Sequence, residues 1–407
     1  MDLRALVERR LVDAGAVDLD VDVVAVGKAS REMAGAVRAV LGRRVRRQLI
    51  VVDVARSEED VEGDVVVGEH PIPGPGSLVA GERLVEFLGE PSDAACTLFL
   101  VSGGASSLCA VPEEPLTLAE LHELWMAALA AGLDITTLNR LRAATSAIAG
   151  GAVLRRVRTP RSCSLVMVDN VLSGPRWVAS GLTYDYSPTR SEVEQLVSRV
   201  GRTATALESS LLEAFERRAV AMAAPITTDH VNLVVAEPSM LLALASGEAA
   251  RRGYRVVELG SAVQGDVADA VTRFSEILRG ESATDDRLCV IGVGEVTVRV
   301  LGSGTGGRCQ EFAWRMAVEL ADLGRDGVVV ARASDGRDFV AGVAGAWVDE
   351  RTTARAAALG LDWRALLDAN DSHRGLERLQ QLIGGAPTGW NLCDLSVALR
   401  GPTATAP

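Results

Sequence analysis

The chemistry that this sequence offers starts with a single lysine. The chain carries 42 lysine and arginine residues, and Lys28 is the one lysine among them. An ammonium group is a compact point charge, and a planar guanidinium does not replace it at every phosphate. Lys28 follows the apolar run VDVVAVG, at the carboxyl end of a predicted strand, where open α/β sheets bind ligands. We therefore interpret Lys28 as an active-site cation, although the loop is not a Walker motif, because Asp22 stands in place of its first glycine.

Two glycine-rich loops follow other predicted strands. The first, SGGASS, begins at residue 102 after the run TLFLV, and the second, GSGTGG, begins at residue 302 after TVRVL. Glycine lets the backbone approach an anion, and successive amides form a cradle for phosphate or carboxylate. Arg308 opens a predicted helix after the second loop, and we interpret it as a second active-site cation. The residues expected to bind phosphate or an anionic substrate are Ser102, Gly103, Gly104, Ala105, Ser106, Gly304, Gly306 and Gly307.

Acidic and polar side chains follow further strands. Asp169 ends the run SLVMVD, and Asp335 lies in ASDGRD, three residues before a second acid, Asp338. A carboxylate in such a place can hold Mg²⁺ or accept a hydroxyl proton, and the sequence does not choose between Asp169 and Asp335 for either role. A surface turn with a helix-capping aspartate is the alternative for the Asp335 pair. His70, in a proline-rich loop, and Asn391, in PTGWNLCDL, complete the candidate binding residues.

Composition excludes several classes of protein. The 407 residues carry a net charge of -12, which argues against a nucleic-acid-binding surface. No apolar stretch reaches the roughly 18 residues that a membrane span needs. The six cysteines form no CxxC pair, and the N-terminus is not a signal peptide, so we expect reduced thiols and a cytoplasmic location.

Apolar runs alternate with amphipathic stretches, which indicates an α/β protein with parallel strands. We expect two domains: an N-terminal Rossmann-like parallel sheet with helices on both faces, over residues 1–225, and a smaller C-terminal α/β domain with a mixed sheet, over 226–407. The boundary is placed in an Ala/Pro/Thr stretch at 221–228, which follows a long predicted helix at 191–218 and precedes a new strand.

Taken together, the motifs resemble the class II glycerate kinase family, whose C-terminal part carries the MOFRL region. The matching phrases appear in the family's order and are VGKAS, GEHPIP, LVSGGAS, WVASGLT, GSGTGGRCQE, ASDGRD, NDS and PTGWNLCDL. The resemblance implies an ATP- and Mg²⁺-dependent phosphoryl transfer to a hydroxyl of D-glycerate, in a cleft between the two domains. It also implies that Lys28 and Arg308 are active-site cations.

The sequence departs from the family on the side expected to bind the acceptor. Ala143, Ala144 and Ala149 stand where basic groups would be, and residues 172–174 replace a Gly-Asp-Asp phrase. Trp390 is a bulky addition before Asn391. Because a desolvated carboxylate needs paired cations, these losses should weaken recognition of a small acid such as glycerate.

The leading hypothesis is therefore a kinase that uses ATP and Mg²⁺ to phosphorylate D-glycerate or a related hydroxylated metabolite. The expected partners are small molecules and, in a homodimer, a second copy of the chain. Such transfer rests on positioning and charge stabilisation. One alternative is a diverged kinase for a larger alcohol in a specialised pathway, and another is a non-catalytic nucleotide- or metabolite-binding homologue. A nicotinamide-dependent oxidoreductase is a weaker third, because no GxGxxG follows the first strand.

Overall fold

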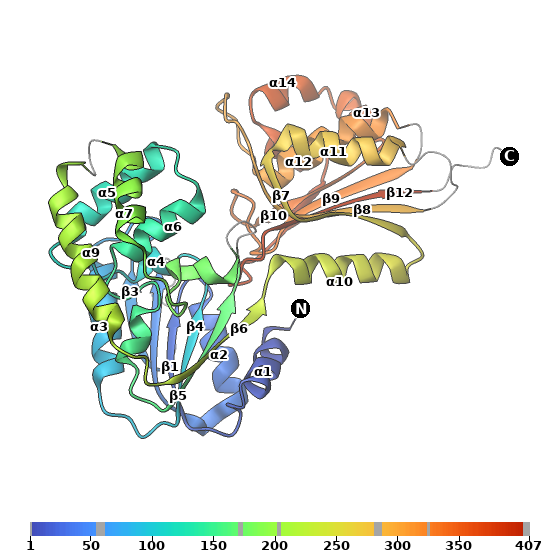
Figure 1. Cartoon of the computed structure of the whole chain (residues 1–407). Coiled ribbons are helices and arrows are strands. Elements are labelled where there is room, and N and C mark those ends of the chain that lie inside the picture. Colours follow the sequence, from blue (N-terminus) through green and yellow to red (C-terminus); the bar gives the residue numbers. More distant parts are fainter. Residues whose placement is uncertain are drawn as a thin grey trace. The chain divides into compact units, whose positions relative to one another are not determined.

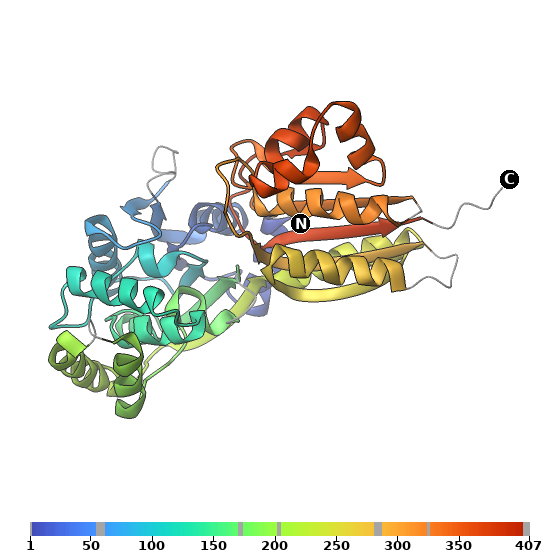
Figure 2. The same ribbon diagram turned by 90° about the horizontal axis from the view of Figure 1, so that it is seen from above.

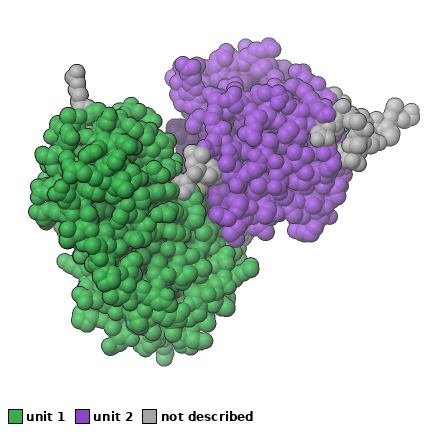
Figure 3. Space-filling view, in the orientation of Figure 1, with its two compact units in different colours: residues 1–236 green, residues 237–407 purple. Residues whose placement is uncertain are grey.

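The computed structural model describes residues 2–53, 62–169, 174–201, 205–280, 287–323 and 326–401. The chain divides into two compact units, Met1–Ala236 and Glu237–Pro407, which are coloured separately in Figure 3. Leu172 and Ser173, two of the departures noted above, lie outside the described residues. Within the described part, no helix has the length and apolarity to cross a membrane.

The first unit is built on a parallel sheet of six strands. Its order is β3-β2-β1-β4-β5-β6, which is the Rossmann order, and every neighbouring pair is parallel. The inner strands are buried along their whole length because helices cover both faces of the sheet. The strands are β1 (Val21–Val26), β2 (Val45–Asp53), β3 (Asp64–Gly68), β4 (Cys96–Val101), β5 (Arg161–Met167) and β6 (Asp229–Ala236).

Helices of the first unit pack on both sides of this sheet (Figure 1), as predicted. The helices α1 and α2 contact one another and the strands, and α3 packs on β2 and β3. The helices are α1 (Leu3–Asp13), α2 (Ser30–Leu41), α3 (Pro75–Gly89), α4 (Ala105–Leu108), α5 (Leu118–Ala130), α6 (Ile135–Ala144), α7 (Arg190–Val200) and α9 (Glu208–Ala223), with 3-10 turns η1 (Gly42–Arg44), η3 (Ala152–Arg156) and η4 (Pro175–Ser180).

The division between the units differs from the predicted one at 225/226. The strand β6 falls in the predicted second domain, but it pairs in parallel with β5 and completes the first sheet. The single helix predicted over 191–218 is also two helices, α7 and α9, because α7 ends at Gly201, which has φ +81.

The second unit contains a mixed sheet of six strands in the order β11-β10-β9-β12-β8-β7. Only β7 and β8 are parallel; the other neighbours are antiparallel. The strands are β7 (Arg255–Asp266), β8 (Leu288–Thr297), β9 (Gly327–Ala333), β10 (Val343–Asp349), β11 (Leu382–Gly384) and β12 (Asp394–Arg400). The mixed sheet of the second domain is therefore confirmed.

Two helices of the second unit lie side by side on one face of its sheet, and α10 (Pro238–Arg251) covers the other face (Figures 1 and 2). The paired helices, α11 (Val267–Gly280) and α12 (Arg308–Ala321), bury an aromatic core in which Phe274 and Phe312 meet edge to face. Three short helices, α13 (Thr352–Ala358), α14 (Trp363–Asp368) and α15 (Ser372–Arg378), lie near α12.

Candidate functional site

The chain around Lys28 lies where the strand order of the first sheet reverses. The strands β1 and β4 are neighbours, and Val26 pairs with Val101 at their carboxyl ends. Consecutive connections run outward in opposite directions from this point, which leaves a crevice for ligands in open α/β sheets. The two loops are joined by hydrogen bonds, since the Lys28 amide donates to the Gly103 carbonyl at 2.9 Å and the Ala29 amide donates to Ser102 Oγ at 3.0 Å.

Two other predicted residues, His70 and Asp169, lie against this pair of loops. Gly104 has φ +82, and a Cβ there would lie 3.1 Å from His70 Cδ2 and 3.2 Å from Lys28 Cγ. A Cβ at Gly103 would overlap the carboxylate of Asp169, which follows β5. The tertiary structure therefore brings Lys28, His70, Asp169 and the first glycine loop together, and we call this group the Lys28 cluster.

The amides of the first glycine loop point to no group within the chain. In the residues that the structure describes, the backbone N–H groups of 103–106 donate no hydrogen bond. The Ser106 hydroxyl lies 2.7 Å from that of Ser180. Consecutive unbonded amides beside an exposed ammonium are suited to holding an anion.

His70 is uncharged at neutral pH. Partial burial, together with the nearby charges of Lys28 and Arg142, lowers the pKa of His70 to about 4, against the opposing effect of Asp53. The ring is therefore available to this cluster as a neutral hydrogen-bonding group.

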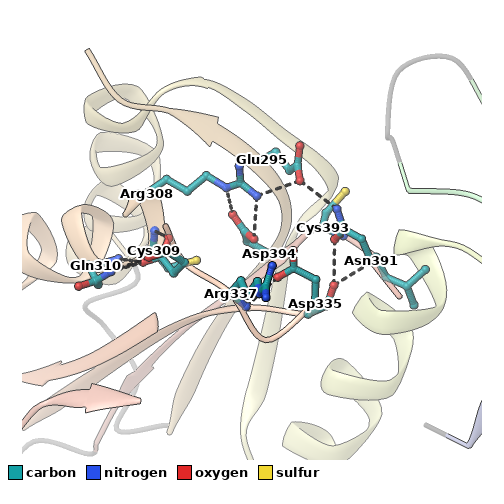
Figure 4. Close-up of polar contacts among 12 residues, drawn as sticks. Glu295, Arg308, Cys309, Gln310, Asp335, Arg337, Asn391, Cys393 and Asp394 are labelled. Carbon is teal, nitrogen blue, oxygen red and sulfur yellow. Dashed lines mark hydrogen bonds and ion pairs between the residues drawn. The ribbon is translucent and has the colours of Figure 1, made fainter. Parts of the chain in front are cut away.

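Arg308 begins α12 in the second unit, and its guanidinium is already paired with two acids (Figure 4). It donates to both oxygens of Asp394 and, at 2.9 Å, to Glu295 Oε1. Burial lowers the pKa of Arg308, but these ion pairs outweigh burial and hold it above the usual value. Burial also raises the pKa of Asp394 to about 6, against the lowering effect of Arg308. The amide of Asn391 donates to Glu295 at 3.3 Å, so Asn391 belongs to this polar group.

The second glycine loop differs from the expected phosphate cradle. The Gly304 amide donates to the Ala369 carbonyl at 2.8 Å, and the Thr305 amide donates to Asp371 Oδ1 at 3.1 Å. A Cβ at Gly304 would lie 2.5 Å from the Cβ of Asp371. The predicted role of the Gly304 amide as a phosphate donor therefore does not hold in this conformation, because the amide is used to join the loop to residues 369–371. The predicted strand at 297–301 is also absent, since β8 ends at Thr297 and residues 298–301 are irregular.

The start of α12 is capped from within the chain. The buried carboxylate of Asp338 accepts the amides of Cys309 at 3.1 Å and Gln310 at 2.8 Å. Burial raises the pKa of Asp338, against the hydrogen bonds from Gln310. Asp338 therefore has the helix-capping role that was the alternative for the Asp335 pair.

An open cavity of about 540 Å³ gathers the remaining predicted residues of the second unit. Its volume lies within the range of about 300–1,000 Å³ that is usual for small-molecule and cofactor sites. Phe339 at its edge is 83% exposed. The predicted residues in its wall are Gly304, Gly306, Gly307, Arg308 and Asp335, and Arg337, Val298 and Val300 also line it.

Asp169 and Asp335, the acids predicted to hold Mg²⁺, would each need other ligands to complete a site. Among the described residues, no three His, Cys, Asp or Glu side chains form a group that could hold a metal ion. Mg²⁺ commonly binds through one or two carboxylates plus substrate phosphates and keeps several waters. Single carboxylates such as Asp335 fit that mode of binding.

Sequence reasoning missed two functional candidates in the first unit. Neither Arg142 nor Trp125 was singled out from the sequence. Both line a pocket beside the first glycine loop. The available signal was the position of Arg142, which lies four residues after the buried Leu138 on α6, where the helix faces the protein interior.

The chain matches two family models. One is described as a domain of unknown function, DUF4147, and covers residues 4–216, just over half of the chain; the other is the MOFRL family, over 288–394.

Curated proteins and solved structures also match over most of their length. The chain is similar to a D-glycerate 2-kinase of Thermotoga maritima, with 29% identity over 93% of this chain and 90% of the relative. A relative from Agrobacterium vitis, 29% identical over 93% of this chain and 99% of its own length, is provisionally named a hydroxypyruvate reductase. The crystal structure of a glycerate kinase from Thermotoga maritima superposes with a TM-score of 0.83 and 26% identity, over 98% of this chain and 99% of that one. One family model covers just over half of the chain, and the relatives match nearly all of it. The chain therefore belongs to the class II glycerate kinase family, with its MOFRL region.

Proposed function

We propose that the protein is an ATP-dependent kinase that phosphorylates a hydroxyl of D-glycerate. The observation that carries the proposal is the Lys28 cluster, in which the chain's single lysine lies beside unbonded amides at the crevice of a Rossmann-like sheet. Relatives named glycerate kinase supply the acceptor. In the reaction, the γ-phosphorus loses its bond to the leaving oxygen of ADP and forms one to the substrate hydroxyl, which loses its proton.

We assign the nucleotide to the cavity of the second unit and the acceptor to the first unit. The cavity of about 540 Å³ is large enough for a nucleotide, and it offers Arg337 to phosphates and the exposed Phe339 to a base. The pocket beside the first glycine loop is small, which favours the smaller substrate.

Charge stabilisation is the main task of the protein in phosphoryl transfer. In our proposal Lys28 neutralises charge that builds on the transferred oxygens, and the unbonded amides hold an anionic end of the substrates. Asp169 orients the acceptor hydroxyl and accepts its proton. Asp335 helps to hold Mg²⁺, which would neutralise phosphate charge when it is bound with ATP.

The first test is Lys28→Met. We expect kcat to fall by about 100- to 1,000-fold, since one charged donor aimed at developing charge supplies roughly 3–4 kcal/mol of the barrier. Because Lys28 is exposed and lies outside regular structure, the melting temperature should not change. Transfer from ATP to D-glycerate is measured with purified protein, and Arg43→Met, at an exposed cation, is the control. Near-normal turnover in Lys28→Met would remove Lys28 from the mechanism.

The same assay separates the other candidate activities. Transfer to a larger alcohol but not to D-glycerate favours the diverged kinase, and ATP binding without transfer favours a non-catalytic homologue. Oxidation of NADH or NADPH by hydroxypyruvate tests the reductase activity for which one relative is named. A cytoplasmic location and a homodimer stay predictions, which cell fractionation and sedimentation would test.

A further inference from the structure

A small pocket in the first unit lies beside the first glycine loop. Ala105 and Ser106 of the loop line it, and its other walls are mostly apolar. Its free space is about 20 Å³, which suits one or two water-sized groups and not a nucleotide. The other lining residues are Val26, Cys109, Ala110, Leu121, Trp125, Arg142, Ser146, Ile148, Ala149, Ala179, Ser180 and Leu182.

One wall of this pocket carries an arginine, Arg142, that has no acidic partner in the described part of the chain. Among the residues that the structure describes, no carboxylate lies within ion-pair distance of Arg142, and its buried Nε donates no hydrogen bond. Burial lowers the pKa of Arg142 to about 10, and no acid among the described residues opposes the change. Uncompensated burial of a charge is costly, so a partner that is not part of the described chain is expected.

The arginine is held in place by an aromatic ring that itself has an unused donor. The Arg142 guanidinium lies 4.7 Å from the centre of the Trp125 ring, close enough for a cation–π interaction. Trp125 is 5% exposed, and within the described chain its indole N–H has no acceptor. Two buried N–H groups that find no acceptor among the described residues therefore line the same pocket, and both require one to offset their loss of water.

We propose that Arg142 and Trp125 form the subsite for the carboxylate of a small hydroxy acid. The proposal rests on the proposed kinase function and names the part of the acceptor that the first unit recognises. A carboxylate supplies acceptor oxygens without donors and forms paired bonds with a guanidinium. The charge of Arg142 also acts on His70, so the subsite belongs to the same sheet edge as the Lys28 cluster.

Size and charge favour a carboxylate over a phosphate in this pocket. The free space of about 20 Å³ admits a small planar group, and Arg142 is the one cation among the described residues that line the pocket. Ala149, one of the alanines that replace expected basic groups, also lines it. The acceptor side therefore keeps a positive charge, that of Arg142, although residue 149 is not a cation.

The test compares binding and selectivity in Arg142→Met, Arg142→Lys and Trp125→Phe. We expect Arg142→Met to weaken binding of D-glycerate by about 10- to 100-fold in calorimetry, as expected for loss of a hydrogen bond to a charged group. Arg142→Lys should retain only part of the wild-type affinity for D-glycerate, because lysine lacks the planar guanidinium that pairs with a carboxylate. Trp125→Phe keeps the ring and removes one donor, and we expect a loss of about 3- to 10-fold. The KM for ATP should not change in any variant.

Selectivity distinguishes recognition of a carboxylate from a structural role. The wild type should prefer D-glycerate to glycerol in kcat/KM, and Arg142→Met should lose most of that preference. Arg140→Met is the matched control, because it removes the same charge from an exposed position on the same helix. Inorganic phosphate, titrated in parallel, should bind to the wild type and to Arg142→Met with equal affinity.

Three outcomes would overturn the subsite. Unchanged glycerate affinity and unchanged preference in folded Arg142→Met would overturn it and leave the kinase proposal intact. A loss of phosphate binding equal to the loss of glycerate binding would reassign the pocket to phosphate. No glycerate binding to the wild type, together with transfer from ATP to an uncharged alcohol, would reject both the subsite and D-glycerate while retaining phosphoryl transfer.

Discussion

Two loops built from glycine and other small residues differ in what their glycines do. In the loop at 102–107, the glycines leave amides unbonded within the described chain and make room for Lys28, His70 and Asp169. In the loop at 302–307, the glycines make room for residues 369–372 and Asp338. Amides of this loop donate hydrogen bonds to residues 369–371. A glycine-rich loop after a strand thus indicates close backbone approach, but the approaching group can be a ligand or the protein itself.

The comparison predicts its largest effect at Gly103. The three atoms nearest to a Cβ in Gly103→Ala all belong to the end of the Asp169 side chain, so activity should suffer more than stability. We expect kcat/KM to fall by about 100-fold, as for loss of one precisely placed catalytic group. The free energy of unfolding should change by less than about 1 kcal/mol. Urea denaturation and steady-state kinetics measure the two effects.

Gly35→Ala is the control for this experiment, because a Cβ at Gly35 on α2 meets open space. It should leave activity unchanged and keep or raise stability. If Gly103→Ala unfolded more easily and kept its activity per folded molecule, the first loop would resemble the second, and the contrast would fail.

Gly304→Ala should show the opposite pattern. Its Cβ would lie 2.6 Å from the carbonyl oxygen of Ala369, which is backbone and cannot move aside without shifting the loop. We expect a loss of about 1–3 kcal/mol in the free energy of unfolding, as for overpacking, with kcat of the folded protein within tenfold of wild type. Gly247→Ala, in open space on α10, is the control in the same unit. An equally stable but inactive Gly304→Ala protein would instead support a direct role in phosphate binding.

The smallest effect concerns pH. The pKa of His70 is lowered from 6.5 to about 4 on folding, so the unfolded chain binds a proton more readily between these values. Stability should therefore fall as pH drops through this window, and His70→Gln should flatten that part of the curve. The pKa of Asp394 is raised to about 6, so Asp394 increases stability as pH falls. Its contribution is the same in the wild type and in His70→Gln and cancels in their difference. Unfolding free energies at pH 4 to 7 provide the measurement, and identical slopes would show that His70 is not shielded.

Much of the first unit could be predicted because its signals are local. The run VDVVAV, predicted as a strand, coincides with β1, since hydrophobic pattern and length set this element. The strands β10 and β12 were not predicted, and β6 was placed in the other domain. Strand pairing depends on partners distant in the chain, such as β5 for β6, and no local pattern encodes them.

The candidate site divides in the same way. Lys28, Asp169 and the first glycine loop were found from their places after apolar strands, and the parallel sheet brings those places to one edge. Arg142 was missed, because an arginine on an amphipathic helix normally faces solvent. Its spacing of four residues from Leu138 points to the inward face of α6, and the packing of α6 sets it against Trp125.

The sequence by itself determined which residue types are present, the alternation of strands and helices, and the resemblance to a kinase family. The tertiary structure decided which amides, cations and acids remain available to a ligand. Arg308 is paired with Asp394 and Glu295, the Gly304 amide is bonded to Ala369, and Arg142 has no acid beside it in the described chain. The physical reason is that hydrogen bonds and ion pairs are satisfied by groups that are near in space, and folding brings together groups that are distant in sequence.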